Sequence, residues 1–297
     1  KTLLDDIKKF PTKAHPMDAA RTAVSIMGLE DEETKDNSPK ANMRKVMRIF
    51  AKTPVALAAF YRTRKGKKII LPKSNLSFSE NFFYMCFGKV PEKDIVKAFD
   101  VSLILYAEHS FNVSTFTART ITSSLSDIHG AITGAIASLK GPLHGGANEE
   151  VMHMMNKIKK PENAFKWINK ALDNKDVVMG FGHRVYKSGD SRVPTMREYF
   201  GKVAKIKNDK KFEKIYDIVE SVMIEKKNIH PNVDYPTGPT YHLMGFDTDF
   251  FTPIFVISRI TGWSAHIMEQ HSANKLIRPL ASYRGNKHRK VMELNHR

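Results

Sequence analysis

The chain has 297 residues, 41% of them hydrophobic, which is enough for a sizeable core in one large domain or two unequal ones. No apolar run approaches the roughly 20 residues of a membrane-spanning helix, and the single cysteine, Cys86, excludes an intrachain disulfide and a cysteine-based metal site. The net charge of +17 fits a solvated basic surface, a polyanionic small molecule such as a nucleotide or CoA, or nucleic acid, although no nucleic-acid-binding signature accompanies the scattered lysines.

The start of the sequence shows neither an initiator methionine nor the apolar core of a signal peptide. From the lone cysteine we expect a reducing, cytoplasmic setting. We expect no membrane partner.

Helix signals dominate from the first residues onward. A helix is predicted over 16–27, and Ser38 followed by Pro39 supplies the N-cap and first-turn proline of a second helix that runs towards Phe50. Ser79 is expected to open a third helix. Further helices are predicted at 91–108, 113–125, 127–139, 147–158, 162–173, 194–206, 211–226 and 249–272.

Two further local signals concern a helix end and a possible strand. Gly88 lies where the helix after Ser79 should end. The run 68–71, which Pro72 stops, is the one segment typical of a short extended strand. Since no other strand signal is present, the predicted fold class is all-α.

Small residues recur every fourth position in the predicted helix 127–139, at Gly130, Gly134 and Ser138. Such a stripe lets two helices approach closely. It fits tight packing within the core and a helix-mediated dimer interface equally well.

Three separate segments each present one ionisable residue among glycines, prolines and small residues. His144 lies in 141–148 (GPLHGGAN), His183 in 180–186 (GFGHRVY), and Asp234 in 231–239 (PNVDYPTGP). Two histidines and a carboxylate can remove a proton, polarise a carbonyl and stabilise an enol. Taken singly, each residue also fits an ordinary loop, turn or helix-cap role.

Other arrangements point away from metal and dinucleotide chemistry. His266 and His271 are five residues apart and so do not share one helix face, which favours packing or capping over a metal site. Gly180 and Gly182 lack the third glycine and preceding strand of a dinucleotide-binding fingerprint. We expect no metal and no cofactor.

Taken together, the motifs resemble the citrate synthase family, over nearly the whole chain from 15–18 (HPMD) to 277–279 (IRP). The segment 106–119 (YAEHSFNVSTFTAR) is characteristic, as are the three segments around His144, His183 and Asp234, in that order. The sequence looks most like the short 2-methylcitrate and bifunctional citrate synthases of bacteria.

The resemblance implies a role for each of these three side chains. Asp234 would be the base that takes the α-proton of an acyl-CoA thioester. His144 would stabilise the resulting enol, and His183 would polarise the keto group of oxaloacetate that the enol attacks. Hydrolysis of the acyl-CoA intermediate would then release 2-methylcitrate from propionyl-CoA, the donor we favour, or citrate from acetyl-CoA, the alternative.

Five further residues match family positions in the oxaloacetate site. His109, Arg192 and Arg259 would hold the oxaloacetate carboxylates, and Phe255 would line the same pocket. Arg278 matches a position that reaches in from the partner subunit, which implies a homodimer with shared active sites. Arginines suit this substrate because a guanidinium binds a carboxylate through two parallel hydrogen bonds.

For the second substrate, CoA would lie along 177–187. Gly180 and Gly182 would allow its close approach, and Lys187 would contact a phosphate. The basic cluster 62–68 is a weaker candidate.

The resemblance also implies the citrate synthase architecture. A large helical domain would comprise 1–143 and 244–297, and a smaller helical domain, 144–243, would be inserted into it. The active site would lie between them and exclude water on closure.

Two departures from the family pattern are visible. An N-terminal portion is expected to be missing, with any CoA contact it supplies. Tyr106 stands where many citrate synthases have histidine, which suits the methylcitrate-type branch.

Two rivals to the condensing enzyme remain open, a basic helical protein that binds nucleic acid and an inactive scaffold that keeps the fold.

Overall fold

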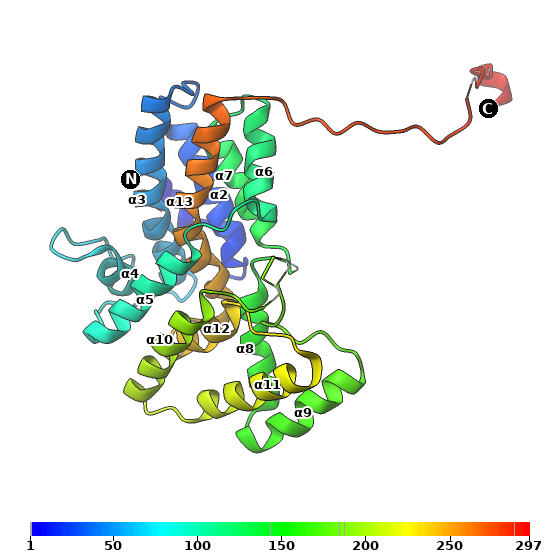
Figure 1. Ribbon diagram of the computed structural model, residues 1–297. Helices are drawn as coiled ribbons and strands as arrows, with labels where there is room; N and C mark the ends of the chain where they lie inside the picture. The colour runs from blue at the N-terminus through cyan, green and yellow to red at the C-terminus, as the bar shows by residue number, and fades with distance from the viewer. Residues whose placement is uncertain (1, 143, 184, 187, 288) are drawn as a thin grey trace.

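The computed structural model describes residues 2–142, 144–183, 185–186, 188–287 and 289–297, and within them the protein is helical (Figure 1). No strand is assigned in these residues, so the all-α prediction is confirmed. The helices are α1 (Thr2–Ile7), α2 (Pro16–Glu30), α3 (Pro39–Thr63), α4 (Phe78–Phe87), α5 (Lys93–Tyr106), α6 (Val113–Ser123), α7 (Ile128–Leu139), α8 (Ala147–Ile158), α9 (Pro161–Asp173), α10 (Val193–Ile206), α11 (Lys211–Lys227), α12 (Asp234–Leu243) and α13 (Phe251–Ser272), with short 3-10 turns at η1 (Thr248–Phe250) and η2 (Leu294–His296).

Several helix ends form as the sequence predicts. The Ser38 side chain accepts a hydrogen bond from the backbone N–H of Ala41, and Pro39 opens α3. Gly88 ends α4 in the left-handed conformation, at φ 80°. These caps satisfy backbone groups that a helix end leaves without partners, and they therefore fix where each helix begins and ends.

Three sequence predictions about local structure are wrong. The run 68–71 forms no strand, because no extended neighbour lies beside it; the half-buried Ile69 packs against the small cluster of α1, α2 and α3 instead. Ser77, not Ser79, caps α4 through a reciprocal capping box with Glu80. The second predicted helix continues past Phe50 to Thr63, with a buried proline inside it.

A further finding concerns the proline-rich segment around Asp234, for which the sequence left a loop, turn or helix-cap role open. It forms α12, which begins at Asp234 and contains Pro239 in its interior. Pro236 lies in the first turn, where the missing N–H has no helical partner to lose. Most of α12 is buried, so tertiary packing outweighs the cost of Pro239.

The helices form two groups (Figure 1). In one half of the molecule α13 lies between α3 and α6, with α2 and α7 packed behind it. In the other half α8, α9 and α11 lie together, and α12 packs against both α8 and α10. Trp263 of α13 is completely buried. The division into domains 1–143 with 244–297 and 144–243 stays a prediction.

The small-residue stripe of α7 faces α6 at its centre. A Cβ built on Gly134 would lie 2.2 Å from Cδ1 of Ile121, so a larger residue would require the end of this side chain to move. This contact favours tight packing within the core as the role of Gly134.

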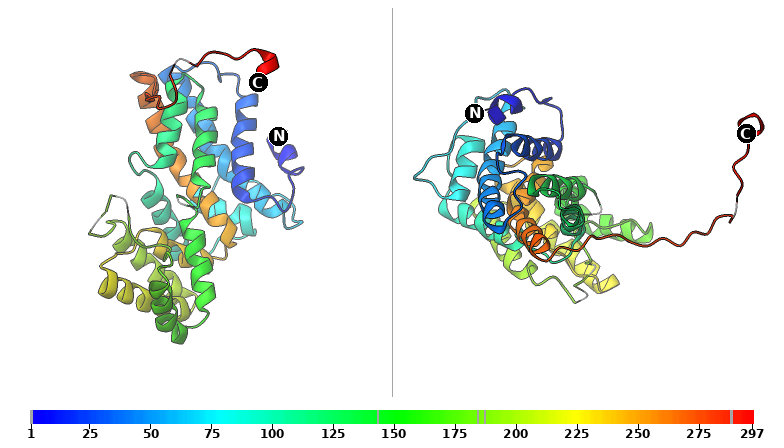
Figure 2. Two further views of the ribbon diagram at one scale, coloured as in Figure 1. Left: turned by 90° about the vertical axis from the view of Figure 1, so that its right-hand side faces the viewer. Right: turned by 90° about the horizontal axis from the view of Figure 1, so that it is seen from above.

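After α13 the chain leaves the helical body as an extended segment, which Figure 1 and the right view of Figure 2 show projecting from it. Apolar side chains in this segment are open to solvent, including Leu280, which is 95% exposed. Among all the described residues, no helix combines the length and the apolar character that crossing a bilayer requires.

Candidate active site

Backbone hydrogen bonds join the segment that carries His183 to the segment that precedes Asp234. The N–H of Gly182 donates to the carbonyl of His230 at 2.9 Å, and the N–H of Asn232 donates to the carbonyl of Gly180 at 2.9 Å. The side-chain amide of Asn232 donates to the carbonyl of Gly182 at 3.0 Å. Two sequence motifs about fifty residues apart are thereby held together.

Gly180 is required at this junction for two reasons. Its φ is +84°, a left-handed conformation that other residues rarely adopt. A Cβ at this position would also lie 2.9 Å from the Tyr235 side chain and 2.7 Å from that of Val151. Gly182 shares the positive φ, at +77°. The structure assigns both glycines a backbone role, and their proposed contact with CoA stays a prediction.

Asp234 lies at the first position of α12 and meets Tyr106, the last residue of α5. The Tyr106 hydroxyl donates to Oδ1 of Asp234 at 2.6 Å. Burial raises the pKa of Asp234 to about 6, against the opposing effects of the Tyr106 hydrogen bond and the charges of Arg192 and Arg259. A carboxylate with this pKa is mostly ionised at neutral pH and is suited to accept a proton.

His109 and His183 face each other with their Nε2 atoms 3.0 Å apart. Nδ1 of His183 accepts hydrogen bonds from the backbone N–H groups of Val185 and Tyr186, so the neutral ring carries its proton on Nε2. Burial lowers the pKa of His109 to about 4, and the charge of Arg192 adds to this effect. The Nε2 atom of a neutral His109 can therefore accept a hydrogen bond from the Nε2–H of His183.

His144 contacts the N-terminal end of α6. Its Nε2 accepts a hydrogen bond from the backbone N–H of Ser114 at 3.2 Å and lies 2.8 Å from the Ser114 hydroxyl. The proton of the neutral ring must then lie on Nδ1. Burial lowers the pKa of His144 to about 4, and the charges of Arg259 and His109 act in the same direction. The site thus holds a neutral imidazole that donates from Nδ1.

Arg192, which precedes α10, forms a two-pronged ion pair with Asp190. Its Nε donates to Oδ1 at 2.9 Å and one terminal nitrogen donates to Oδ2 at 2.7 Å. The Arg192 side chain is 13% exposed, and the Asp190 side chain is fully buried. The guanidinium is held in place and still has donors left for an anion.

Arg259 of α13 is a buried cation without a carboxylate partner in the described residues. It is 1% exposed, its Nε donates to the carbonyl of Tyr106 at 2.6 Å, and its guanidinium lies over the Phe255 ring. One terminal nitrogen is buried without a hydrogen-bond partner. Burial lowers the pKa of Arg259 to about 10, and Arg192 adds to this. An anionic ligand would satisfy this buried donor.

The predicted catalytic side chains therefore converge with most of the predicted oxaloacetate residues. Phe255 joins them by packing its ring 4.2 Å from that of Tyr106. Arg278 is not brought there, because it is exposed on the C-terminal extended segment. Lys187 lies outside the described residues.

The basic cluster 62–68 is largely used in structural contacts. Arg62 donates to the carbonyl of Cys86, Arg64 pairs with Asp249, and Lys65 pairs with an aspartate before η1. These contacts tie the end of α3 to α4 and to the region of η1. They reduce the case for this cluster as a CoA contact.

The sequence reasoning missed two buried partners of the site, Ser114 and Asp190. Asp190 lies two residues before Arg192, a spacing that permits the ion pair but does not reveal it. Ser114 is visible only as the second residue of a helix whose N-cap is Asn112. Neither position carries a signal that singles it out without the fold.

His266 and His271 take part in packing contacts of α13. His266 Nε2 lies 3.1 Å from the Glu108 carboxylate, and His271 Nε2 lies 3.1 Å from the carbonyl of Ser126. These different partners agree with the capping and packing interpretation.

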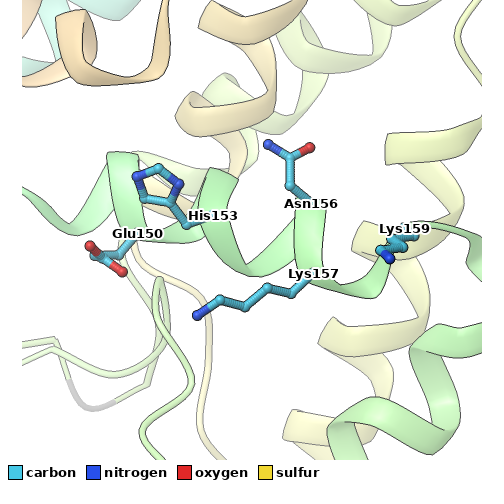
Figure 3. Close-up of a pocket in the computed structure, with 5 residues that line it drawn as sticks. All are labelled: Glu150, His153, Asn156, Lys157 and Lys159. Atoms are coloured by element: carbon cyan, nitrogen blue, oxygen red, sulfur yellow. The ribbon is translucent and has the colours of Figure 1, made fainter.

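A separate hollow of about 520 Å³ lies on the outer face of α8 (Figure 3). Its side chains spread along the helix and its C-terminal end and do not converge on one point. It contains none of the predicted site residues. Its lining residues are Glu150, His153, Asn156, Lys157 and Lys159.

Comparison with known proteins identifies the same family that the motifs indicate. The family model for the citrate synthase C-terminal domain matches residues 1–280. The chain is 52% identical over 289 residues to a protein of Mycobacterium tuberculosis named 2-methylcitrate synthase, covering 97% of this chain and 73% of that protein. It is 51% identical to a citrate synthase of Mycolicibacterium smegmatis, over 96% of this chain and 76% of that one.

A solved structure agrees with the sequence relatives. The citrate synthase of Thermoplasma acidophilum, determined in a ternary complex with carboxymethyl coenzyme A and oxaloacetate, matches with a TM-score of 0.89 at 32% identity. The match covers 100% of this chain and 80% of the archaeal one.

Proposed function

The chain belongs to the citrate synthase family, and from this premise we propose that it condenses propionyl-CoA with oxaloacetate and water to give 2-methylcitrate and CoA. The observation that carries the proposal is the convergence of Asp234, His144 and His183 beside Arg192 and Arg259. A base and a hydrogen-bond donor suit a thioester, a second donor suits a ketone, and two arginines suit two carboxylates.

The first step is enol formation. The Asp234 carboxylate takes the proton from the α-carbon of the thioester, and His144 donates from Nδ1 to the thioester oxygen, on which negative charge develops. Because His144 is neutral, it stabilises the enolate by hydrogen bonding without first having to lose a proton.

The second step forms the carbon–carbon bond. The enol carbon attacks the keto carbon of oxaloacetate, and the Nε2–H of His183, which turns from His109 to the ligand, polarises the keto oxygen that becomes the hydroxyl. Arg192, Arg259 and His109 hold the carboxylates of oxaloacetate, beside the Phe255 ring. Water then cleaves the thioester and releases CoA with the new tricarboxylate. Each step uses side chains and substrates alone, so we propose that the reaction needs no metal or other cofactor.

The proposed acyl donor pocket includes Tyr106, whose ring packs against that of Phe255 at an interplanar angle of 42° and whose hydroxyl contacts Asp234. One additional methylene changes the free energy of discrimination by only about 1–3 kcal/mol, so use of both acetyl-CoA and propionyl-CoA is expected. The name of the Mycobacterium tuberculosis relative favours propionyl-CoA.

Measuring kcat/KM for propionyl-CoA and acetyl-CoA with oxaloacetate tests the donor assignment. A higher value for propionyl-CoA supports it. A strong preference for acetyl-CoA would make the protein a citrate synthase, the alternative that the Mycolicibacterium smegmatis relative represents.

We also propose a homodimer in which Arg278 enters the partner's active site. Two observations support this. Arg278 lies on an extended segment outside its own helical body, and α6 carries exposed apolar side chains, Val113 at 62% and Phe116 at 49%. The two-domain division, the CoA path along 177–187 and a cytoplasmic setting belong to the same proposal.

A further inference from the structure

Asp190 is the most deeply buried carboxylate beside the candidate active site, and the proposed reaction gives it no task. Its side chain is 0% exposed. It lies on the connection between His183 and α10, and it accepts hydrogen bonds from two different parts of the chain.

The first set of hydrogen bonds comes from Arg192. Besides the two side-chain hydrogen bonds, the backbone N–H of Arg192 donates to Oδ1 of Asp190 at 3.0 Å. Oδ1 therefore receives both the backbone and the Nε of the arginine, and Oδ2 receives its terminal nitrogen. This arrangement fixes both the position of the Arg192 backbone and the plane of its guanidinium.

The second contact comes from the residue directly before the base. The backbone N–H of Val233 donates to Oδ2 of Asp190 at 3.1 Å. Val233 is the N-cap of α12, so its N–H is one of the donors that the helix itself leaves without a partner. A single carboxylate therefore connects the oxaloacetate arginine to the start of the helix that presents Asp234.

We propose that Asp190 is a positioning residue that couples the placement of Arg192 to the placement of Asp234. This rests on the proposed function, in which Arg192 holds oxaloacetate and Asp234 deprotonates the acyl-CoA. An oxaloacetate carboxylate that pulls on Arg192 acts through Asp190 on the backbone at Val233. Loss of Asp190 then impairs oxaloacetate binding and proton abstraction together.

Charge adds a second consequence of the same geometry. The groups that act on Asp234 are Tyr106, Arg192, Arg259 and Asp190, and the charge of Asp190 raises the pKa of Asp234. Removal of this charge, which also leaves the positive charge of Arg192 uncompensated, would lower the pKa of Asp234. In a plot of kcat against pH, the rise of kcat on the acid side (the acid limb) would then move to lower pH.

The chain contains a matched control for a purely structural ion pair. Asp31 accepts two hydrogen bonds from Arg48, both at 2.8 Å, and one from the backbone N–H of Glu33 at 3.0 Å. Its side chain is 6% exposed. Like Asp190, it accepts a two-pronged arginine pair and a nearby backbone N–H, but it has His129 Nε2 at 3.5 Å in place of the contact to Val233. It lies in the part of the molecule formed by α2 and α3.

The experiment compares Asp190→Asn with Asp31→Asn in the full-length chain, by thermal unfolding and by steady-state kinetics over a range of pH. We expect both variants to lose stability. Only Asp190→Asn should raise the KM for oxaloacetate and lower kcat, each by about tenfold, and shift the acid limb of kcat downward. Equal kinetic behaviour of the two variants, with wild-type values for both, would overturn the proposal.

Two further variants keep the test decisive. If Asp190→Asn does not fold, Asp190→Glu retains the charge but displaces it, so kcat should fall while the acid limb stays in place; wild-type kcat would overturn the proposal. In an Arg192→Gln background, Asp190→Asn should cause little additional rise in the KM for oxaloacetate. If it raises this KM by the same factor as in the wild-type background, Asp190 does not act through Arg192.

Failure of the proposed function gives a different result. In that case the wild-type protein itself releases no CoA thiol from either acyl donor with oxaloacetate. If the wild type is active and Asp190→Asn matches Asp31→Asn, the condensation stands and only the positioning role of Asp190 falls.

Discussion

The Tyr106 hydroxyl donates a hydrogen bond to Oδ1 of Asp234 at 2.6 Å, across 128 positions of sequence. Tyr106 ends α5, and Asp234 begins α12. The contact joins α5 to α12 and ties the proposed base to the tyrosine ring that packs against Phe255. It also favours the ionised form of Asp234, against the effect of burial.

Replacement of Tyr106 by phenylalanine should therefore change the pH dependence of the enzyme. Because the lost hydrogen bond holds the pKa of Asp234 down, this pKa should rise above about 6. The acid limb of kcat should move to higher pH, which is the opposite direction from Asp190→Asn. Steady-state rates of CoA release between pH 5 and pH 9, about two units either side of neutrality, measure this shift.

Tyr241→Phe is the control for this substitution. The Tyr241 hydroxyl is buried and donates to the Ser102 hydroxyl at 2.9 Å, so its loss removes a comparable hydrogen bond within the core. Its acid limb should match that of the wild type. An unchanged acid limb in Tyr106→Phe would contradict the role of this hydrogen bond.

Asp234→Asn should abolish most turnover while oxaloacetate still binds. General base catalysis contributes about 10²–10⁴-fold, so kcat should fall by that order. The arginines that hold oxaloacetate are unchanged, and calorimetric titration should give an affinity near that of the wild type. Loss of oxaloacetate binding equal to the loss of kcat would indicate a structural defect instead.

The same variant should stabilise the fold at neutral pH. The pKa of Asp234 in the folded state, about 6, lies above its ordinary value of 3.8. Ionisation of Asp234 therefore destabilises the fold progressively as the pH rises through this range, and the full cost remains at higher pH. Asparagine avoids that cost, which is about 3 kcal/mol at most. In thermal unfolding the variant should be more stable than the wild type at pH 8, and this difference should disappear at about pH 4. An equal gain in stability at both pH values would show that the ionisation of Asp234 is not its cause.

Arg259→Met should separate ligand binding from stability. The buried guanidinium has one nitrogen without a partner, so a side chain of similar length without charge should cost little stability in the absence of ligand. Oxaloacetate should raise the Tm of the wild type but not that of the variant, because only the wild type can pair the buried charge with a carboxylate. Equal protection of both would exclude Arg259 from the oxaloacetate site.

Mixed dimers test whether Arg278 acts in the partner's active site. Asp234→Asn and Arg278→Ala protomers are each expected to be nearly inactive, but a hybrid dimer contains one site with an intact Asp234 and an intact partner Arg278. Random exchange should restore roughly a quarter of the wild-type activity, since half of the dimers are hybrids with one working site. Absence of recovery, with exchange shown by native mass spectrometry, would place Arg278 in its own protomer's site or outside both.

Much of the fold follows from local sequence signals. The caps at Ser38 and Gly88 are short-range effects, and the structure forms them as predicted. The α12 helix could not be found in this way, because Pro239 in its interior opposes helix formation and only burial against α8 and α10 compensates. The false strand at 68–71 has the converse cause, since a strand requires a neighbour that local sequence does not specify.

The candidate site shows the same division between local and long-range information. His144, His183 and Asp234 stand out because each lies in an unusual segment rich in glycine or proline. Their partners Ser114 and Asp190 have ordinary surroundings in sequence and acquire meaning only when the fold brings them to those residues.

The most direct test of the condensation is release of CoA thiol from propionyl-CoA, followed with a thiol reagent in the presence and absence of oxaloacetate. We predict rapid release that depends strictly on oxaloacetate, with 2-methylcitrate as the product by mass spectrometry. Release at the same rate without oxaloacetate, or no release from either propionyl-CoA or acetyl-CoA, would contradict it.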